Sequence, residues 1–197
     1  MHVYLKGFEI SNSYDQSNKL IILKKHFNII FIVDMKIGII SDTHDNIRNI
    51  MRAIKEFIDK NVDVVIHAGD IISPIAVESF ADVKLVAVLG INDTDVSGLT
   101  AAFNKIHGEL AGEIFERVYD GVNFAVYHGT NLAKREQLMK SGKYDVFIYG
   151  HTHRKEDRKI GSTRVINPGT AKGWFAGLFA TIAVFDTSSR NLEFIDL

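Results

Sequence analysis

The chain contains no cysteine, only two prolines, a single tryptophan and almost no net charge. Without cysteine, disulfides, zinc fingers, iron–sulfur clusters and thiol nucleophiles are excluded, so any metal ion must be held by His, Asp, Glu or Asn. Lys and Arg number 23 against 24 Asp and Glu, which gives a formal net charge of -1. This balance provides no basic excess for binding long nucleic acid, although a short or mononucleotide substrate stays compatible with it.

The sequence also lacks a long hydrophobic run. Its most apolar stretch, residues 27–40, is interrupted by Asp34 and Lys36 and so falls short of the roughly 18 apolar residues that a membrane span needs. The same stretch leads into Asp34 and Met35 rather than into a small-residue cleavage site, which argues against a signal peptide. Together with the absence of cysteine, these features predict a cytoplasmic protein with no membrane partner.

The length of 197 residues predicts one domain, or one domain with an appendage. Residues 11–18 are polar and turn-like, and residues 20–33 are apolar without a clear period, whereas Met35 directly precedes a buried-strand pattern. We therefore divide the chain into an N-terminal extension, 1–34, and a domain, 35–197. The extension is either the product of an upstream start codon or an additional strand or interface segment, which would suit a homo-oligomer.

From Met35 onward, apolar strand patterns alternate with amphipathic helical patterns. The predicted strands cover residues 36–41, 62–66, 83–89, 113–119, 122–127, 146–149, 154–160, 163–166, 179–185 and 192–195, and the predicted helices cover 47–58, 99–106, 132–139 and a segment that starts at Ser73-Pro74. The pattern of the first half predicts parallel strands joined by crossover helices, and that of the second half predicts two hairpins. We predict an α/β fold: a four-layer α-β-β-α sandwich of two mixed sheets flanked by helices.

Polar side chains follow the predicted strands at the points where these end. They are Asp42 and His44, Asp70, Asn92 and Asp93, His128, and His151 and His153. Because ligands of open α/β sheets bind at the carboxyl ends of the strands, these separate segments are expected to converge on one site.

Carboxylate and imidazole ligands together suit manganese, iron, nickel, cobalt or zinc rather than calcium. The candidate ligands are Asp42, His44, Asp70, His128, His151 and His153. Six ligands are more than one metal ion uses in a tetrahedral or facial-triad site. Two ions about 3.5–4 Å apart that share one carboxylate would use them all and would acidify a water into a nucleophile. Because such a pair also neutralises charge on a phosphoryl group, phosphate ester hydrolysis is the leading chemistry.

In this order, the five motifs resemble those of the calcineurin-like metallophosphoesterases, and the small archaeal and bacterial phosphodiesterase branch is the most similar. The motifs are Asp42-x-His44, Gly69-Asp70, Gly90-x-Asn92-Asp93, His128-Gly129 and Gly150-His151-Thr152-His153, followed by Asn167-Pro168-Gly169. The resemblance runs from Met35 to the C-terminus and leaves residues 1–34 uncovered.

The resemblance implies two divalent transition metal ions, with manganese or nickel favoured. It implies that one ion is held by Asp42, His44, Asp70 and His153, and that Asp70 bridges to a second ion held with His128 and His151.

The sequence departs from the family pattern in the third motif. The family has an asparagine ligand directly after the glycine, but here that position is Ile91, and Asn92 comes one residue later. Either the loop shifts so that Asn92 reaches the metal, or the second site lacks a ligand. Asn92 also stands where phosphomonoesterases and nucleases of the superfamily carry a proton-donating histidine. No residue is therefore assigned as the general acid, and catalysis would depend on the metals and on good leaving groups.

Each motif also has a purely structural interpretation. Asp42 could cap the following helix, His128 could be a hydrogen-bonded core residue, and His151 and His153 could be a solvated pair on a loop. Only their joint occurrence favours the metal site.

Three further features are interpreted structurally. We interpret His67 as a packed residue or one that supports the ligands from behind, and Arg135 as a solvated helix charge. Asn167-Pro168-Gly169 is most simply a tight turn, and only the family resemblance places it near the metals.

The leading functional hypothesis is a metal-dependent phosphodiesterase acting on a small phosphate-ester substrate, either a diester or a nucleotide. One alternative is a non-catalytic protein-binding scaffold, because the retromer subunit with this fold resembles these enzymes. The other alternative is a phosphomonoesterase.

Overall fold

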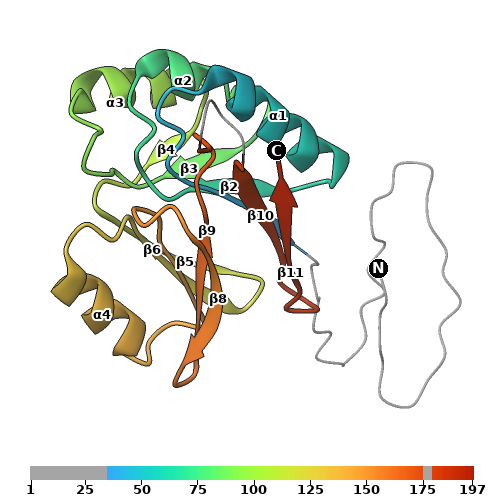
Figure 1. Ribbon diagram of the computed structural model, residues 1–197, viewed down its shortest axis with the longest axis vertical. Helices are drawn as coiled ribbons and strands as arrows, with labels where there is room; N and C mark the ends of the chain where they lie inside the picture. Colours follow the sequence, from blue (N-terminus) through green and yellow to red (C-terminus); the bar gives the residue numbers. More distant parts are fainter. Residues whose placement is uncertain (1–34, 175–178) are drawn as a thin grey trace, which may run out of the picture.

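The computed structural model describes residues 35–174 and 179–197, so the predicted extension 1–34 lies outside the described residues. Within the described residues, two mixed sheets lie face to face between helices, which gives four layers in the order α-β-β-α (Figure 1). The predicted fold class is confirmed.

The six-stranded sheet has the strand order β11-β10-β1-β2-β3-β4. Its strands are β1 (Lys36–Ile40), β2 (Val64–His67), β3 (Leu85–Ala87), β4 (Glu109–Leu110), β10 (Thr181–Asp186) and β11 (Leu192–Asp196). Strands β1 to β4 are parallel, and β10 pairs antiparallel with both β1 and β11. The carboxyl ends of β1, β2 and β3 therefore share one edge of this sheet.

The five-stranded sheet has the order β5-β6-β7-β9-β8. Its strands are β5 (Ile114–Tyr119), β6 (Val122–Tyr127), β7 (Val146–Ile148), β8 (Lys155–Ile160) and β9 (Thr163–Pro168). Strands β6, β7 and β9 are parallel, and the two predicted hairpins form the antiparallel pairs β5–β6 and β8–β9.

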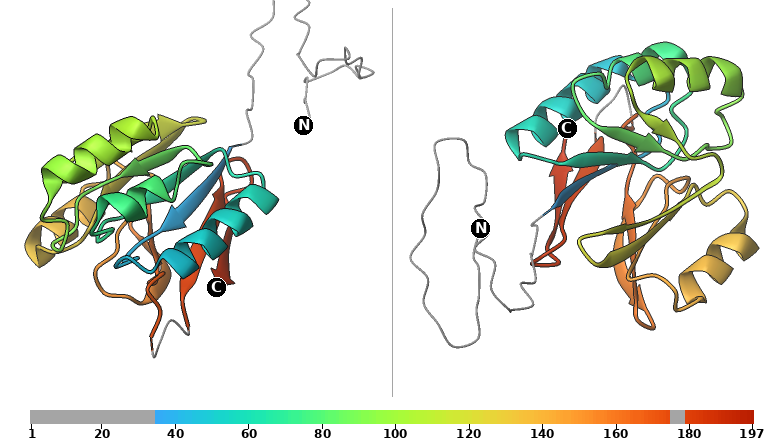
Figure 2. Two further views of the ribbon diagram at one scale, coloured as in Figure 1. Left: turned by 90° about the horizontal axis from the view of Figure 1, so that it is seen from above. Right: turned by 180° about the vertical axis from the view of Figure 1, so that it is seen from behind.

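Each helix begins at a side chain that caps its first turn. The helices are α1 (Ile47–Asp59), α2 (Pro74–Glu78), α3 (Val96–Lys105) and α4 (Leu132–Lys140). Asn46, Ser73, Asp95 and Asn131 accept hydrogen bonds from backbone N–H groups three residues ahead, and Pro74 occupies the first position of α2. Helices α1 to α3 cover the outer face of the six-stranded sheet, and α4 covers the outer face of the five-stranded sheet (Figures 1 and 2).

The continuous apolar strand patterns are explained by burial on both faces. Along β1, Ile37 and Ile39 pack between the two sheets, whereas Ile40 packs under the helices. Along β6, Phe124 lies between the sheets and Tyr127 lies in the cluster under α4. Successive side chains of a strand point to opposite faces, so a strand inside this sandwich is apolar on both faces over its buried part.

The structure differs from the sequence-based elements at several boundaries; the strand predicted over residues 83–89, for example, covers only Leu85–Ala87 as β3. The short strand β4 carried no sequence signal, α3 begins at Val96 rather than at residue 99, and β9 extends through Pro168. Asn167 and Pro168 are therefore strand residues, and the tight-turn interpretation is wrong for them. None of the helices in residues 35–174 and 179–197 has the length and apolar character needed to span a membrane.

Candidate metal centre

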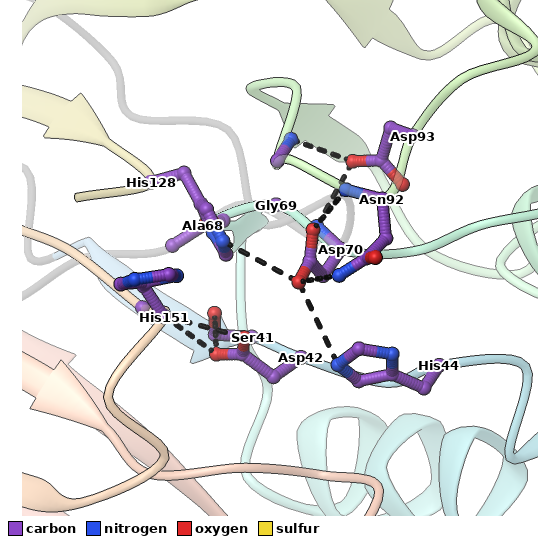
Figure 3. Close-up of polar contacts among 12 residues, drawn as sticks. Ser41, Asp42, His44, Ala68, Gly69, Asp70, Asn92, Asp93, His128 and His151 are labelled. Carbon is purple, nitrogen blue, oxygen red and sulfur yellow. Dashed lines mark hydrogen bonds and ion pairs between the residues drawn. The ribbon is translucent and has the colours of Figure 1, made fainter. Parts of the chain in front are cut away.

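The polar residues that follow five strands lie together at one end of the sandwich. The strands are β1, β2 and β3 of one sheet and β6 and β7 of the other. The residues are Asp42, His44, Asp70, Asn92, His128, His151 and His153. In Figure 3, the side chains of His44, His128 and Asn92 point toward Asp70. Contacting residues of the centre can lie more than 100 positions apart in the sequence, and His151 and Asp42, for example, are separated by 109.

Asp70 lies between two imidazoles from different loops. Its Oδ2 is 3.6 Å from His44 Nε2 and 3.4 Å from His128 Nε2. Neither nitrogen has a hydrogen-bond partner within the described part of the chain, although both atoms are buried. A carboxylate oxygen between two bare imidazole nitrogens is the arrangement expected of a shared metal ligand.

Asp42 takes part in two groups whose potential ligand atoms all lie within 4.8 Å of one another. One group contains Asp42, His44 and His153, and the other contains Asp42, Asp70 and His128. The rings of His44 and His153 are 5.5 Å apart, with His153 Nε2 3.2 Å from Asp42 Oδ1. The two groups share Asp42, and Asp70 contacts one imidazole of each group, His44 and His128. A carboxylate is therefore available to both groups, as two neighbouring cations require.

His151 is placed differently from the other candidates. Its side chain belongs to neither group, but its ring lies 5.3 Å from that of His128, and its backbone N–H donates to Asp42 Oδ2 at 3.1 Å. The loop is therefore fixed to the centre through its backbone, with the imidazole beside the second group.

The tautomer of His128 follows from its hydrogen bond. Its Nδ1 is 2.8 Å from the carbonyl oxygen of Ala68, which can only accept, so Nδ1 carries the proton. The Nε2 lone pair of the neutral ring then faces the Asp70 carboxylate. Two electron-rich atoms this close are stable only with a proton or a metal cation between them, so the donor set fits a metal ion.

The electrostatics of the centre agree with this interpretation. Burial alone raises the pKa of Asp70, but contact with His128 and hydrogen bonds from Asn92 outweigh it and hold this pKa well below its usual range. Burial lowers the pKa of His128, but Asp70 and Asp42 outweigh that effect, and its pKa is raised overall. The field that favours a proton on His128 favours any cation at the same position.

Burial lowers the pKa of two further imidazoles, the partly exposed His44 and the exposed His151. Metal ligation requires neutral imidazole, so these two side chains are in the form that binds a metal near neutral pH.

Asn92 reaches the centre, whereas Ile91 does not. The Asn92 backbone N–H donates to Asp70 Oδ1 at 2.9 Å and its Nδ2 donates to Asp70 Oδ2 at 2.7 Å. The Ile91 side chain is 57% exposed. The loop thus turns the amide toward Asp70 and leaves the isoleucine in solvent.

The backbone of the centre is strained at several candidate ligands. Asp42, His44, Asp70, His151 and His153 all have φ between 42° and 65°. A positive φ is uncommon for residues other than glycine, and such strain concentrates at functional sites, where surrounding contacts enforce it. Gly90 and Gly150 permit the close approach, since a Cβ on Gly90 would lie 2.2 Å from Asp70 Oδ1.

Asp93 joins two of the strand-end loops. Its Oδ2 accepts hydrogen bonds from the N–H groups of Asp70 and Gly90 at 2.9 and 2.7 Å, and its Oδ1 accepts from Ile72 N–H at 2.7 Å. This buried carboxylate therefore positions Asp70 without facing the metal centre.

Two further residues support the ligand loops from behind. Asn167 Nδ2 donates to Gly150 O at 2.8 Å and to Thr152 Oγ1 at 3.1 Å, which fixes the loop between His151 and His153. The ring of His67 bonds Thr43 Oγ1 at 3.1 Å and accepts from Gly69 N–H at 3.2 Å. His67 is thus a buried support, as the sequence suggested, and Asn167 holds the loop that carries the candidate ligands His151 and His153.

Sequence reasoning missed two side chains at the edge of the centre. The ring of Trp174 lies 5.8 Å from that of His153. Arg135 was interpreted as solvated, but its guanidinium lies 5.0 Å from the centre of the Tyr149 ring, and its Nε is buried with no hydrogen-bond partner among the described residues. A lone tryptophan and a helix charge have no spacing signal that points to a site far along the chain.

Comparison with known proteins agrees with this geometry. A family model described as the calcineurin-like phosphoesterase superfamily domain matches residues 35–190. The chain belongs to this superfamily. The match begins at the methionine that precedes β1, and it includes every candidate ligand of the metal centre.

Individual relatives of this phosphoesterase domain are also similar in sequence and structure. A phosphodiesterase of Methanocaldococcus jannaschii is 39% identical over 83% of this chain and 99% of the relative. A solved structure of an archaeal phosphodiesterase has a TM-score of 0.77 at 37% identity and covers 83% of this chain and 100% of that chain.

More distant structures share the fold alone. Vacuolar protein sorting 29 from Cryptosporidium parvum has a TM-score of 0.56 at 17% identity, covering 82% of this chain and 96% of that chain. Membership of the superfamily implies divalent metal ions and a phosphate-ester substrate.

Proposed function

We propose that this phosphoesterase is a metal-dependent phosphodiesterase that hydrolyses a small phosphodiester or nucleotide. The observation that carries the proposal is the position of Asp70 Oδ2 between two buried imidazole nitrogens, those of His44 and His128, which have no hydrogen-bond partner among the described residues. The high identity to a phosphodiesterase over almost its full length supports a diester rather than a monoester substrate.

For the metal ligands, we propose two sets that share Asp70. Asp42, His44, Asp70 and His153 hold one divalent ion, and Asp70, His128, His151 and Asn92 hold the second. Asn92 is included because its amide already contacts Asp70 Oδ2, and rotation of an amide group presents oxygen in place of nitrogen to the same neighbour. Manganese or nickel suits this mixture of imidazole, carboxylate and amide ligands.

When bound, two such ions supply an acidified water as the nucleophile and neutralise the charge on the phosphoryl group. The protein residues orient this chemistry: Asp93 fixes the backbone of Asp70, and the Ala68 carbonyl fixes the ring of His128. In the sequence, Asp93 rather than a proton-donating histidine follows Asn92, so we expect a preference for diesters whose leaving group is already a weak base.

The test is hydrolysis of bis-p-nitrophenyl phosphate by the manganese- or nickel-loaded protein. Asp70→Asn should lower kcat/KM by more than about 100-fold, because loss of residues that merely support metal ligands already costs about 10–100-fold. Asp82→Asn, at an exposed aspartate, is the matched control and should leave the rate unchanged.

Other outcomes of this assay would support different functions. Metal binding without turnover of either ester would favour a protein-binding scaffold. Faster hydrolysis of p-nitrophenyl phosphate than of the diester would favour a phosphomonoesterase.

We also propose that the functional domain is residues 35–197. Met35 N–H donates to Thr187 Oγ1 at 3.0 Å, and Thr187 N–H donates to the Met35 carbonyl at 2.9 Å, so the first strand is joined to the end of β10. A chain that begins at Met35 should keep the thermal unfolding midpoint and the metal affinity of the full chain. If sedimentation shows that only the full chain is oligomeric, residues 1–34 contribute to an interface.

A further inference from the structure

The single tryptophan of the chain lies at the edge of the metal centre. The indole of Trp174 is 49% exposed, and its ring meets that of His153 in an edge arrangement, 5.8 Å between centroids and 66° between planes. His153 in turn is 3.2 Å from Asp42 through its Nε2. The indole is therefore a large, flat, apolar surface that is open to solvent and lies next to one of the proposed ligands, His153.

The segment that carries Trp174 is fixed to the strand end that carries Asp42. Ala171 N–H donates to the Ser41 carbonyl and Lys172 N–H donates to the Asp42 carbonyl, both at 2.9 Å. Thr170 Oγ1 also donates to the Asp42 carbonyl at 2.9 Å. The position of the indole is thus set by the same backbone that positions a proposed metal ligand.

The first turn of α1 holds the segment from its other side. Asn46 Nδ2 donates to the Lys172 carbonyl, and Asn49 Nδ2 donates to the Ala171 carbonyl, both at 2.9 Å. Lys172 itself is exposed, so its ammonium adds a positive charge to the segment that carries the indole. A flat aromatic surface and a cation on one ordered backbone match the two parts of a nucleotide, its base and its phosphate.

We propose that Trp174 is a specificity-determining residue that stacks on the nucleobase of a nucleotide-type phosphodiester held at the metal centre. Stacking on an aromatic side chain tolerates every base, because each base has a π-face. The inference rests on the proposed function, since it names the substrate class of the same site. It predicts that diesters with a nucleobase arm are preferred over diesters with alkyl arms.

Binding without turnover provides the first test. Because Trp174 is the sole tryptophan, the intrinsic tryptophan fluorescence of the metal-loaded protein reports on this position alone. Titration with adenosine 5′-monophosphate should quench the emission with saturation, whereas ribose 5-phosphate, which carries the same phosphate and no base, should leave it nearly unchanged. Equal responses to both ligands, or none to the nucleotide, would overturn the proposal.

Kinetics provide the second test. Trp174→Ala should reduce the preference for the p-nitrophenyl ester of thymidine 5′-monophosphate over ethyl p-nitrophenyl phosphate by about tenfold or more through KM, in line with the effect of stacking residues. Trp174→Phe should keep most of the preference, and the ethyl diester, which has the same leaving group and no base, should be hydrolysed alike by all forms. A parallel loss on both substrates would mean that Trp174 is merely structural.

Phe179→Ala is the matched control. Phe179 is an exposed aromatic residue, 71% accessible, in the same stretch of chain, and it makes no ring contact with the proposed ligands among the described residues. If Phe179→Ala removes the base preference as Trp174→Ala does, Trp174 is not the platform. Absence of hydrolysis with every diester would defeat the proposed function, while the fluorescence titration would still decide the stacking.

Discussion

Replacing Asp93 by asparagine tests how the protein positions Asp70, the aspartate proposed to bridge the two ions. The Asp93 carboxylate is 4% exposed and accepts three backbone hydrogen bonds, one from Ile72 through Oδ1 and two from Asp70 and Gly90 through Oδ2. Asparagine has almost the same shape but only one oxygen. Its NH₂ group must face at least one backbone N–H, and two donors repel each other.

The magnitude follows from the hydrogen bonds that are lost. A hydrogen bond to a charged acceptor contributes about 1.5–3 kcal/mol, and the buried donor left behind costs a similar amount. With the amide oxygen at the position of Oδ2, the Ile72 bond is lost, and the other two become bonds to a neutral acceptor. We expect Asp93→Asn to lower the free energy of unfolding by about 2–4 kcal/mol. Affinity for manganese should fall by about 10–100-fold, because the Asp70 backbone is held less firmly.

The assay separates the two effects. Urea unfolding of the metal-free protein measures stability, and calorimetric titration with manganese measures affinity. Asp95→Asn is the control: Asp95 is exposed, caps α3 and accepts from Gly98 N–H at 2.9 Å, so its replacement should cost no more than about 1 kcal/mol and leave the affinity unchanged. If Asp93→Asn binds manganese as tightly as the wild type, the positioning argument is refuted.

Three further predictions concern pH, packing and metal. Burial lowers the pKa of His67 from 6.5 to about 4, so only the unfolded chain takes up this proton between those values. The free energy of unfolding should therefore fall by about 3 kcal/mol between pH 6.5 and 4, and His67→Gln should lack this part of the slope in urea unfolding. Gly150→Ala would place a Cβ 1.9 Å from Ser41 Oγ and should cost at least about 1–3 kcal/mol, whereas Gly142→Ala, with no heavy atom within 4 Å, should cost only about 1 kcal/mol for its positive φ; thermal unfolding would compare them. Manganese at 100 times its Kd should stabilise the wild type by about 2.7 kcal/mol, and the absence of a thermal shift in the wild type, or an equal shift in Asp70→Asn, would contradict the assignment of that ligand.

Local patterns were sufficient for most of the fold. The amphipathic spacing over residues 47–58 predicted α1 (Ile47–Asp59), and the Asp120-Gly121 turn predicted the pairing of β5 with β6. Such signals depend on neighbouring residues, which the sequence contains in full. The strand β4 could not be found in this way, because its two residues are ordered by pairing with β3 rather than by their own pattern.

The chemical types at the strand ends were also readable from the sequence, since each motif is a short run beside an apolar strand. The sequence left open whether Asn92 reaches the centre or the second site lacks a ligand, because the difference from the family pattern is one residue in a loop. The structure turns Asn92 toward Asp70 through contacts 22 positions apart in the chain.

Residues that act through distant partners had no local signal. The sequence around Asn167 indicates a turn, but in the structure its amide holds the loop of His151 and His153. Trp174 is an isolated aromatic residue in the sequence, but in the structure it lies beside His153. The sequence by itself determined which elements form and which side chains are available to bind metal. Only the tertiary structure decided which of them meet, because the packing of two sheets brings together loops that are far apart along the chain.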